Sequence, residues 1–111
     1  MNKRKVIASS GNVFADLGLA DAEETMAKTK LALRIVEIIR ERKLSQAKAG
    51  QLLEVDQPKI SALIRGKLDG FSTERLFRFL NALGRDVEIF IRPKPQGTKQ
   101  ARVRVFAATE S

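Results

Sequence analysis

The sequence contains no cysteine and no histidine. Without cysteine the chain forms no disulfide, and without either residue type a structural zinc site is not expected. The same absences remove the usual pairs of nucleophile and base that serve covalent catalysis. The sequence also lacks a glycine-rich phosphate loop and any recognisable pair of carboxylates. We therefore predict that the protein is not an enzyme and that it needs no cofactor or metal.

Long apolar runs are missing as well. A membrane-spanning helix needs roughly 18 consecutive apolar residues, and no stretch of the sequence approaches that length. The N-terminal MNKRKVIASS is basic but lacks the apolar centre of a signal peptide. We therefore expect a cytoplasmic protein without a membrane partner.

The chain has a globular composition and an excess of positive charge. Its 111 residues, 43% of them hydrophobic and 31% charged, suit a single domain with one modest core. The formal net charge is +8, and the excess is largest near the two ends. Such a charge attracts polyanions, nucleic acid among them, although the charge alone does not identify the partner.

The spacing of apolar residues divides the chain into three regions. Residues 1–20 form an N-terminal arm with few periodic positions. Residues 21–84 carry apolar residues at helical spacing and form the main domain, while residues 85–111 form a C-terminal strand or hairpin and a tail. The expected fold class is mainly α, a bundle of four to five helices with a C-terminal strand or β-hairpin.

Two longer helices are expected to frame the main domain. The first begins near Asp21 and ends near Lys43, with acidic residues first and basic residues last, as the helix dipole favours. Its apolar stripe consists of Leu31, Ile35, Ile38 and Ile39, widened by Leu33 and Val36. The last helix covers residues 73–83, with Ser72 as its cap and Gly84 at its end.

Between these helices, residues 44–68 predict two short helices joined by a tight turn. Ser45 is placed to cap the first helix, Val55 is the apolar residue of the turn, and Gly66 ends the second helix. Gly50 lies inside the first helix, where glycine costs about 1 kcal/mol relative to alanine. Close approach of the second helix explains that glycine, and a tolerated surface position is the alternative. The pattern is that of a helix-turn-helix.

The second short helix carries polar or small side chains suited to the major groove. Glutamine bonds bidentately to adenine, lysine reaches guanine or phosphate, serine suits either, and alanine allows a close approach. The expected base-contacting residues are Gln57, Pro58, Lys59, Ser61 and Ala62. The expected phosphate-contacting residues are Gln46, Arg65 and Lys67, the first at a helix N-terminus. Pro58 leaves open whether Asp56 or Gln57 caps this helix, which shifts the base-facing register by one residue.

After the last helix the apolar period changes to two. Val87, Ile89 and Ile91 alternate with other residues, and Val103 and Val105 alternate again beyond the turn-like KPQGTKQ. A β-hairpin would leave an open edge in a helical domain. The apolar residues either face only the core, or the strand pairs with the same strand of a second subunit and fixes the distance between two recognition helices.

The helix-turn-helix resembles that of the phage-repressor-like (Cro-type, or XRE) family. The residues that carry the resemblance are Gln46, Ala49, Gly50, Val55, Ile60, Ser61, Leu63 and Gly66. Alignment with the family pattern favours Asp56 as the cap of the second helix. Glu54 stands where the family has a turn glycine, which suggests that this turn either needs no positive φ there or is longer than usual.

A wider resemblance extends to the HigA-type antitoxins of bacterial toxin–antitoxin modules. It is carried by SGNVFADLGLADAEE, FSTERL, NALG and DVEIFIRP. The resemblance implies a homodimer that represses its own operon through a palindromic operator and neutralises a toxin of the RelE/HigB class. A stand-alone XRE-type regulator and a module that binds only protein remain the alternatives.

Overall fold

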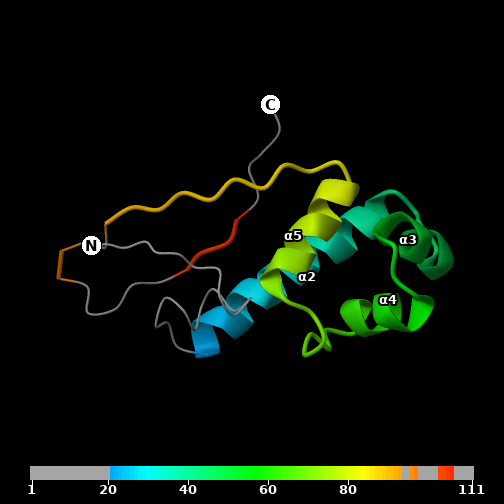
Figure 1. Ribbon diagram of the computed structural model, residues 1–111, viewed down its shortest axis with the longest axis horizontal. Helices are drawn as coiled ribbons and strands as arrows, with labels where there is room; N and C mark the ends of the chain where they lie inside the picture. The colour runs from blue at the N-terminus through cyan, green and yellow to red at the C-terminus, as the bar shows by residue number, and fades with distance from the viewer. Residues whose placement is uncertain (1–20, 94–95, 98–102, 107–111) are drawn as a thin grey trace.

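The computed structural model describes residues 21–93, 96–97 and 103–106. This part of the chain contains four helices, namely α2 (Asp21–Glu41), α3 (Gln46–Leu53), α4 (Gln57–Ile64) and α5 (Thr73–Ala82). α2 packs along α5, while the shorter α3 and α4 contact each other at one end of this pair (Figure 1). The expected mainly α helix-turn-helix fold is confirmed. The predicted N-terminal arm, residues 1–20, lies outside the described residues.

α2 buries the stripe that the spacing of its apolar residues predicts, with one exception. Leu31, Ile35 and Ile38 are buried, and the stripe widens through Val36. Leu33 was expected to widen it too, but this prediction is wrong because 58% of the residue is exposed. At 100° per residue, Leu33 points away from the centre of the stripe.

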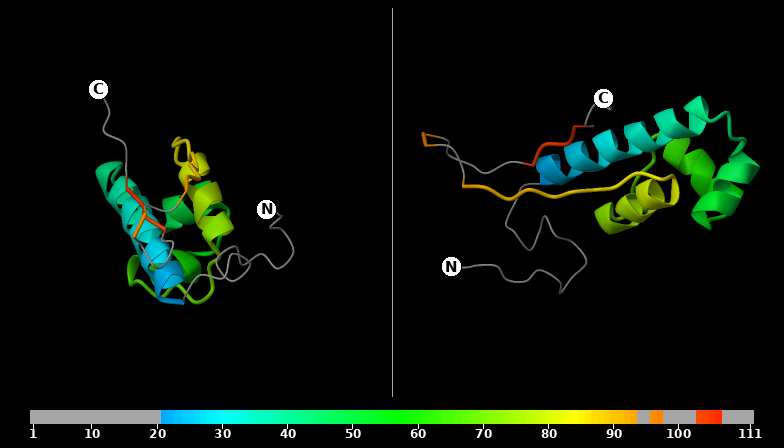
Figure 2. Two further views of the ribbon diagram at one scale, coloured as in Figure 1. Left: turned by 90° about the vertical axis from the view of Figure 1, so that its left-hand side faces the viewer. Right: turned by 90° about the horizontal axis from the view of Figure 1, so that it is seen from above.

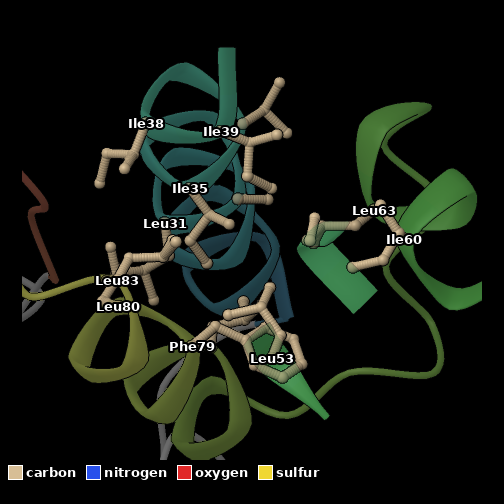
Figure 3. Packing of buried hydrophobic residues seen from close by; sticks show 14 of the residues in the cluster. Leu31, Ile35, Ile38, Ile39, Leu53, Ile60, Leu63, Phe79, Leu80 and Leu83 are labelled. Carbon is tan, nitrogen blue, oxygen red and sulfur yellow. The ribbon is translucent and has the colours of Figure 1, made fainter. Parts of the chain in front are cut away.

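The core lies where α2, α4 and α5 meet. The largest fully buried side chains come in pairs from these segments, namely Ile35 and Ile38, Ile60 and Leu63, and Leu76 and Leu83. Figure 3 shows Ile60 and Leu63 of α4 pointing toward α2, and Leu53 of α3 beside Phe79 of α5, while Ile38 points to the other side of α2. Burying each of these side chains stabilises the folded state by about 1.5–3 kcal/mol. The same core therefore holds the two short helices in place.

α5 ends in contacts that fix the direction of the following chain. Gly84 has a φ of 82°, a left-handed conformation that glycine adopts without strain. The Arg42 guanidinium, just after α2, donates a hydrogen bond of 2.7 Å from Nη2 to the carbonyl oxygen of Leu83. From there the chain runs toward the end of the molecule where α2 begins, away from α3 and α4 (Figures 1 and 2).

The predicted C-terminal strand does not form within the described residues. Residues 85–93 and 103–106 have no strand assignment. Val87 packs against the core as expected, but Ile89 and Ile91 are 67% and 93% exposed, so their predicted core-facing position is wrong. The alternation of apolar and other residues shows that this segment is able to join a sheet. A strand also needs a second strand, whose backbone forms hydrogen bonds with it. The turn of the predicted hairpin falls largely on residues outside the described part.

A second contact places part of the C-terminal segment against α2. The backbone N–H of Val103 donates a 2.9 Å hydrogen bond to Oε1 of Glu23, and Val105 packs against the core.

None of the described helices is both long enough and apolar enough to cross a membrane.

Candidate nucleic-acid interface

The first helix of the motif begins as its sequence predicts. Ser45 is extended, with φ −73° and ψ 166°, and its hydroxyl accepts a 3.1 Å hydrogen bond from the backbone N–H of Lys48. This satisfies one of the N–H groups that have no partner within the helix. Gln46, the predicted phosphate ligand, is the first residue of α3 and is half-buried. It therefore lies beside the positive end of a helix dipole.

Gly50 is the contact point between the two helices. A Cβ atom on Gly50 would lie 2.7 Å from the carbonyl oxygen of Val55 and 3.7 Å from Cγ1 of Ile60. The first distance is shorter than van der Waals contact allows, and its partner is backbone that cannot simply rotate away. The expected close approach at Gly50 is therefore confirmed, and the surface alternative is wrong.

The turn between the helices contains a strained residue. Glu54 has φ 61° and ψ 42°, the left-handed conformation that usually favours glycine. The expectation that Glu54 allows a turn without a positive φ, or a longer turn, is thus wrong. The turn keeps the conformation that the family's glycine would give, because the backbone N–H of Val55 bonds to the Gly50 carbonyl oxygen at 3.0 Å. Non-glycine residues adopt this conformation at a cost of about 1–2 kcal/mol.

α4 begins at Gln57, which fixes the register of its outer face. Asp56 is extended, and its carboxylate accepts a 3.3 Å hydrogen bond from the backbone N–H of Lys59. Asp56 is therefore the cap, as the family alignment favours. Pro58 is then the second helical residue, where its missing N–H has no helical partner to lose.

Gly66 closes the other end of α4. It has φ 76°, and the backbone N–H of Lys67 donates a 2.9 Å hydrogen bond to the carbonyl oxygen of Ala62. This geometry is typical of a helix that ends at a left-handed glycine. Lys67 is exposed directly after this stop, so its side chain is available to a partner.

Most of the predicted base-contacting residues share one face of α4. We call this face the reading face. Its residues are one and four positions apart in the sequence, so they lie on the side of the helix away from the buried Ile60 and Leu63. Gln57 and Pro58 are exposed, while Ser61 and Ala62 are half-buried. Arg65, predicted to contact phosphate, continues this face and is exposed, and its Nε donates a 3.3 Å hydrogen bond to the Ser61 carbonyl oxygen. The reading face consists of Gln57, Pro58, Ser61, Ala62 and Arg65.

Lys59, the fifth predicted base-contacting residue, points elsewhere. Its ammonium group lies 5.2 Å from the ring centroid of Phe71 and 3.5 Å from the carbonyl oxygen of Gly70. Both partners belong to the loop between α4 and α5. Lys59 thus contacts the loop that follows the helix instead of extending from the reading face.

Phe71 is the feature of this region that the sequence did not reveal. It is buried, it packs edge-on against Phe79 with centroids 6.0 Å apart, and the Arg75 guanidinium lies 5.7 Å from its centroid. Lys59 and Arg75 thereby place two cations around one ring. No local pattern predicts these contacts, because Lys59 and Phe71 are 12 positions apart and belong to different elements. The described residues contain no group of three or more side chains able to hold a metal ion.

Comparison with known proteins agrees with this geometry. A family model described as a helix-turn-helix domain matches residues 13–92, well over half of the chain. The chain therefore belongs to the helix-turn-helix domain family.

A second comparison gives the particular group. A solved structure named as an XRE family transcriptional regulator is 50% identical in sequence, with a TM-score of 0.77, and the similarity covers 80% of this chain and 100% of that chain. No curated protein matches the chain. The chain thus belongs to the XRE family of helix-turn-helix transcriptional regulators, a family of DNA-binding proteins and not of enzymes.

Proposed function

We propose that the protein is a sequence-specific DNA-binding repressor that inserts α4 into the major groove. The observation that carries the proposal is the outer face of α4, with Gln57 exposed and Ser61 half-buried, held in a fixed orientation by the Asp56 cap, the Gly50 contact and the buried Ile60 and Leu63. A helix of this kind is what a helix-turn-helix presents to base edges.

Within this proposal, the reading face divides by chemistry. In this proposal Gln57, in the first turn, bonds the adenine edge, while Ser61 and Ala62 allow close approach farther along α4. Gln46, the first residue of α3, and Lys67, exposed after the end of α4, bind phosphate. Arg65 serves the phosphate backbone from the last turn. Lys59 contributes to DNA binding in one of two ways. It holds the loop after α4 in place, or it leaves the Phe71 ring and contacts DNA directly.

The proposed DNA-binding species is a homodimer on a palindromic operator. Two copies of one helix-turn-helix related by a two-fold axis read half-sites separated by a whole number of DNA turns, each about 34–36 Å. The formal net charge of +8 supports the electrostatic part of this binding.

The finer proposal is that the protein is the antitoxin of a type II toxin–antitoxin module. It would repress its own operon and neutralise a RelE/HigB-like toxin. The support is the resemblance of FSTERL, NALG and DVEIFIRP to HigA-type antitoxins. A stand-alone XRE-type regulator is the alternative, and the two differ in whether a small toxin is encoded beside this gene. Coexpression with the neighbouring reading frame tests it, because an antitoxin co-purifies with that product and restores growth that the product alone arrests.

Binding to the DNA upstream of its own gene tests the main proposal. We expect the purified protein to prefer that duplex over a scrambled duplex of equal length, and we expect the affinity to fall as salt is raised. Fluorescence anisotropy over a series of salt concentrations measures both quantities. Equal affinity for both duplexes would contradict sequence-specific repression, and no binding to either would favour the module that binds only protein.

A further inference from the structure

The segment that follows α5 presents large apolar side chains to solvent. Ile89, Phe90 and Ile91 are 67%, 76% and 93% exposed, so three consecutive large apolar residues lie in solvent. Residues 88–92 form no backbone hydrogen bond with any other described residue. Chain of this kind readily pairs with a second extended chain.

The charges on either side of these residues identify a second copy of the same chain as the partner. Glu88 precedes the apolar residues by one position and Arg92 follows them by one position. If two copies run antiparallel with Phe90 opposite Phe90, each Glu88 faces Arg92 of the other copy, and each Ile89 faces Ile91. Opposite charges directly across a strand pair attract, and like charges repel.

The other simple arrangements lose this match. In a parallel pair without stagger, Glu88 faces Glu88 and Arg92 faces Arg92. An antiparallel pair centred on Ile89 sets Glu88 against Phe90, and one centred on Ile91 sets Phe90 against Arg92. Within residues 88–92, the sequence is thus self-complementary in charge and in apolar character only about Phe90.

We propose that two copies of this protein associate through antiparallel pairing of residues 88–92, with the two-fold axis at Phe90. The proposal rests on the homodimer of the proposed function and specifies its interface and register. The resulting two-stranded ribbon gives each exposed isoleucine a partner and gives hydrogen bonds to backbone groups of Glu88, Phe90 and Arg92.

Pro93 fixes which residues donate the inter-strand hydrogen bonds. In an antiparallel ladder, opposite residues alternate between pairs that exchange hydrogen bonds and pairs that do not. Proline has no N–H, so within a sheet its position must need no donor. This requirement makes Pro93–Val87 a non-bonded pair. Two positions along, the Ile91–Ile89 pair is also non-bonded, so the bonds come from Glu88, Phe90 and Arg92. The side chains of non-bonded pairs are also closest, which brings the isoleucines together.

The base of the segment is held firmly enough to orient two domains. Val87 packs on the core, and the Arg42 guanidinium holds the end of α5 through the Leu83 carbonyl oxygen at 2.7 Å. The segment runs away from α4 (Figures 1 and 2). Pairing about Phe90 therefore leaves the α4 helix of each copy away from the ribbon.

Charge exchange across the two-fold axis tests the proposal with full-length protein. Glu88→Arg sets arginine against arginine, and Arg92→Glu sets glutamate against glutamate, so each variant should dimerise at least tenfold more weakly than the unaltered protein. The double variant Glu88→Arg/Arg92→Glu restores both opposite pairs and should dimerise again. Sedimentation equilibrium over a range of concentrations measures each dissociation constant, and Lys30→Glu, an exposed change on α2, is the matched control.

Mixing the two single variants is the most discriminating experiment. A Glu88→Arg chain and an Arg92→Glu chain form two attractive pairs with each other, so the mixture should form a heterodimer that neither variant forms alone. Misfolding of a single variant does not produce that recovery. The proposal is overturned if the unaltered protein is monomeric, if the single variants dimerise as well as it does, or if the mixture stays monomeric.

The same samples separate this proposal from the proposed function. Unchanged dimerisation in the single variants together with specific binding to the upstream duplex refutes the interface and leaves the repressor standing. If the single variants lose dimerisation and their mixture recovers it, but the protein binds neither duplex, the interface stands and the proposed repressor function is refuted.

Discussion

Residues 44–68 and residues 85–93 differ in where their apolar side chains lie. In the helix-turn-helix, Ile60 and Leu63 are fully buried against α2 and α5. In the later segment Ile89 and Ile91 lie in solvent although their spacing is equally regular. A helix satisfies its backbone within its own residues, whereas a strand depends on another chain segment. The first region therefore buries its apolar side chains within one copy of the protein, whereas the second leaves Ile89 and Ile91 exposed.

The largest expected effect contrasts the two regions directly. Leu63→Ala removes a side chain that is 1% exposed and should lower the free energy of unfolding by about 2–5 kcal/mol. Ile91→Ala, at 93% exposure, should change it by less than about 0.5 kcal/mol in protein dilute enough to be monomeric. Urea denaturation measures both values. Similar losses for the two variants would show that the C-terminal segment belongs to the core after all.

The second prediction concerns DNA affinity. Gln57→Ala should weaken binding to the operator by about 1–3 kcal/mol, because a base-edge contact is lost while the fold is unaffected. Gln96→Ala makes the same chemical change at an exposed position in the C-terminal region and should leave affinity unchanged. Anisotropy titrations of both variants provide the comparison. If Gln57→Ala binds like the unaltered protein, Gln57 does not belong to the base-contacting set.

The third prediction concerns the joint between α3 and α4. Gly50→Ala should destabilise the protein by up to about 2 kcal/mol. The overpacking penalty is about 1–3 kcal/mol, and it is reduced by the roughly 1 kcal/mol by which alanine favours a helix. Thermal unfolding measures the change, with Gln51→Ala at the next, exposed position of α3 as control. A stability gain at Gly50 would mean that the 2.7 Å approach to Val55 relaxes freely.

The fourth prediction separates phosphate contacts from base contacts. Lys67→Ala should reduce the salt slope of DNA binding by about one ion and weaken all sequences alike. Lys30→Ala, on the exposed surface of α2, should not alter the slope. Salt titrations on operator and scrambled duplexes test this. A change in sequence preference would place Lys67 at a base edge.

The smallest expected effect is at the strained turn. Glu54→Gly should stabilise the protein by about 0–1.6 kcal/mol. Relief of the left-handed conformation gains about 1–2 kcal/mol, and the added freedom of the unfolded chain removes about 0.4–1 kcal/mol of that gain. Glu54→Ala keeps the Cβ and should show no gain. Denaturant unfolding of the two variants decides the matter, and equal stabilities would remove strain as the explanation.

The features that the sequence predicted correctly depend on local chemistry. The caps at Ser45, Asp56 and Ser72 accept the predicted hydrogen bonds from backbone N–H groups three residues farther along. Gly50 makes the predicted close contact between helices, and Gly66 has the positive φ expected of a glycine that ends a helix. These positions set the orientation of α4, and so most of the candidate site could be inferred before the structure.

The features that the sequence could not predict depend on distant residues. Lys59 turns toward Phe71, and Arg42 bonds to the Leu83 carbonyl oxygen across 41 positions. Glu54 keeps a left-handed turn because the fold around it compensates for the strain. The alternation after Gly84 predicted a strand, but whether a strand forms depends on a partner strand, and the described residues do not supply one.

Footprinting of the promoter upstream of this gene tests the central claim most directly. If α4 reads bases, the unaltered protein should protect two symmetric half-sites, and Gln57→Ala should lose that protection at concentrations where the unaltered protein still protects both. Protection that is spread evenly along the duplex, or that is identical for the two proteins, would contradict the assignment of α4 as the base-reading helix.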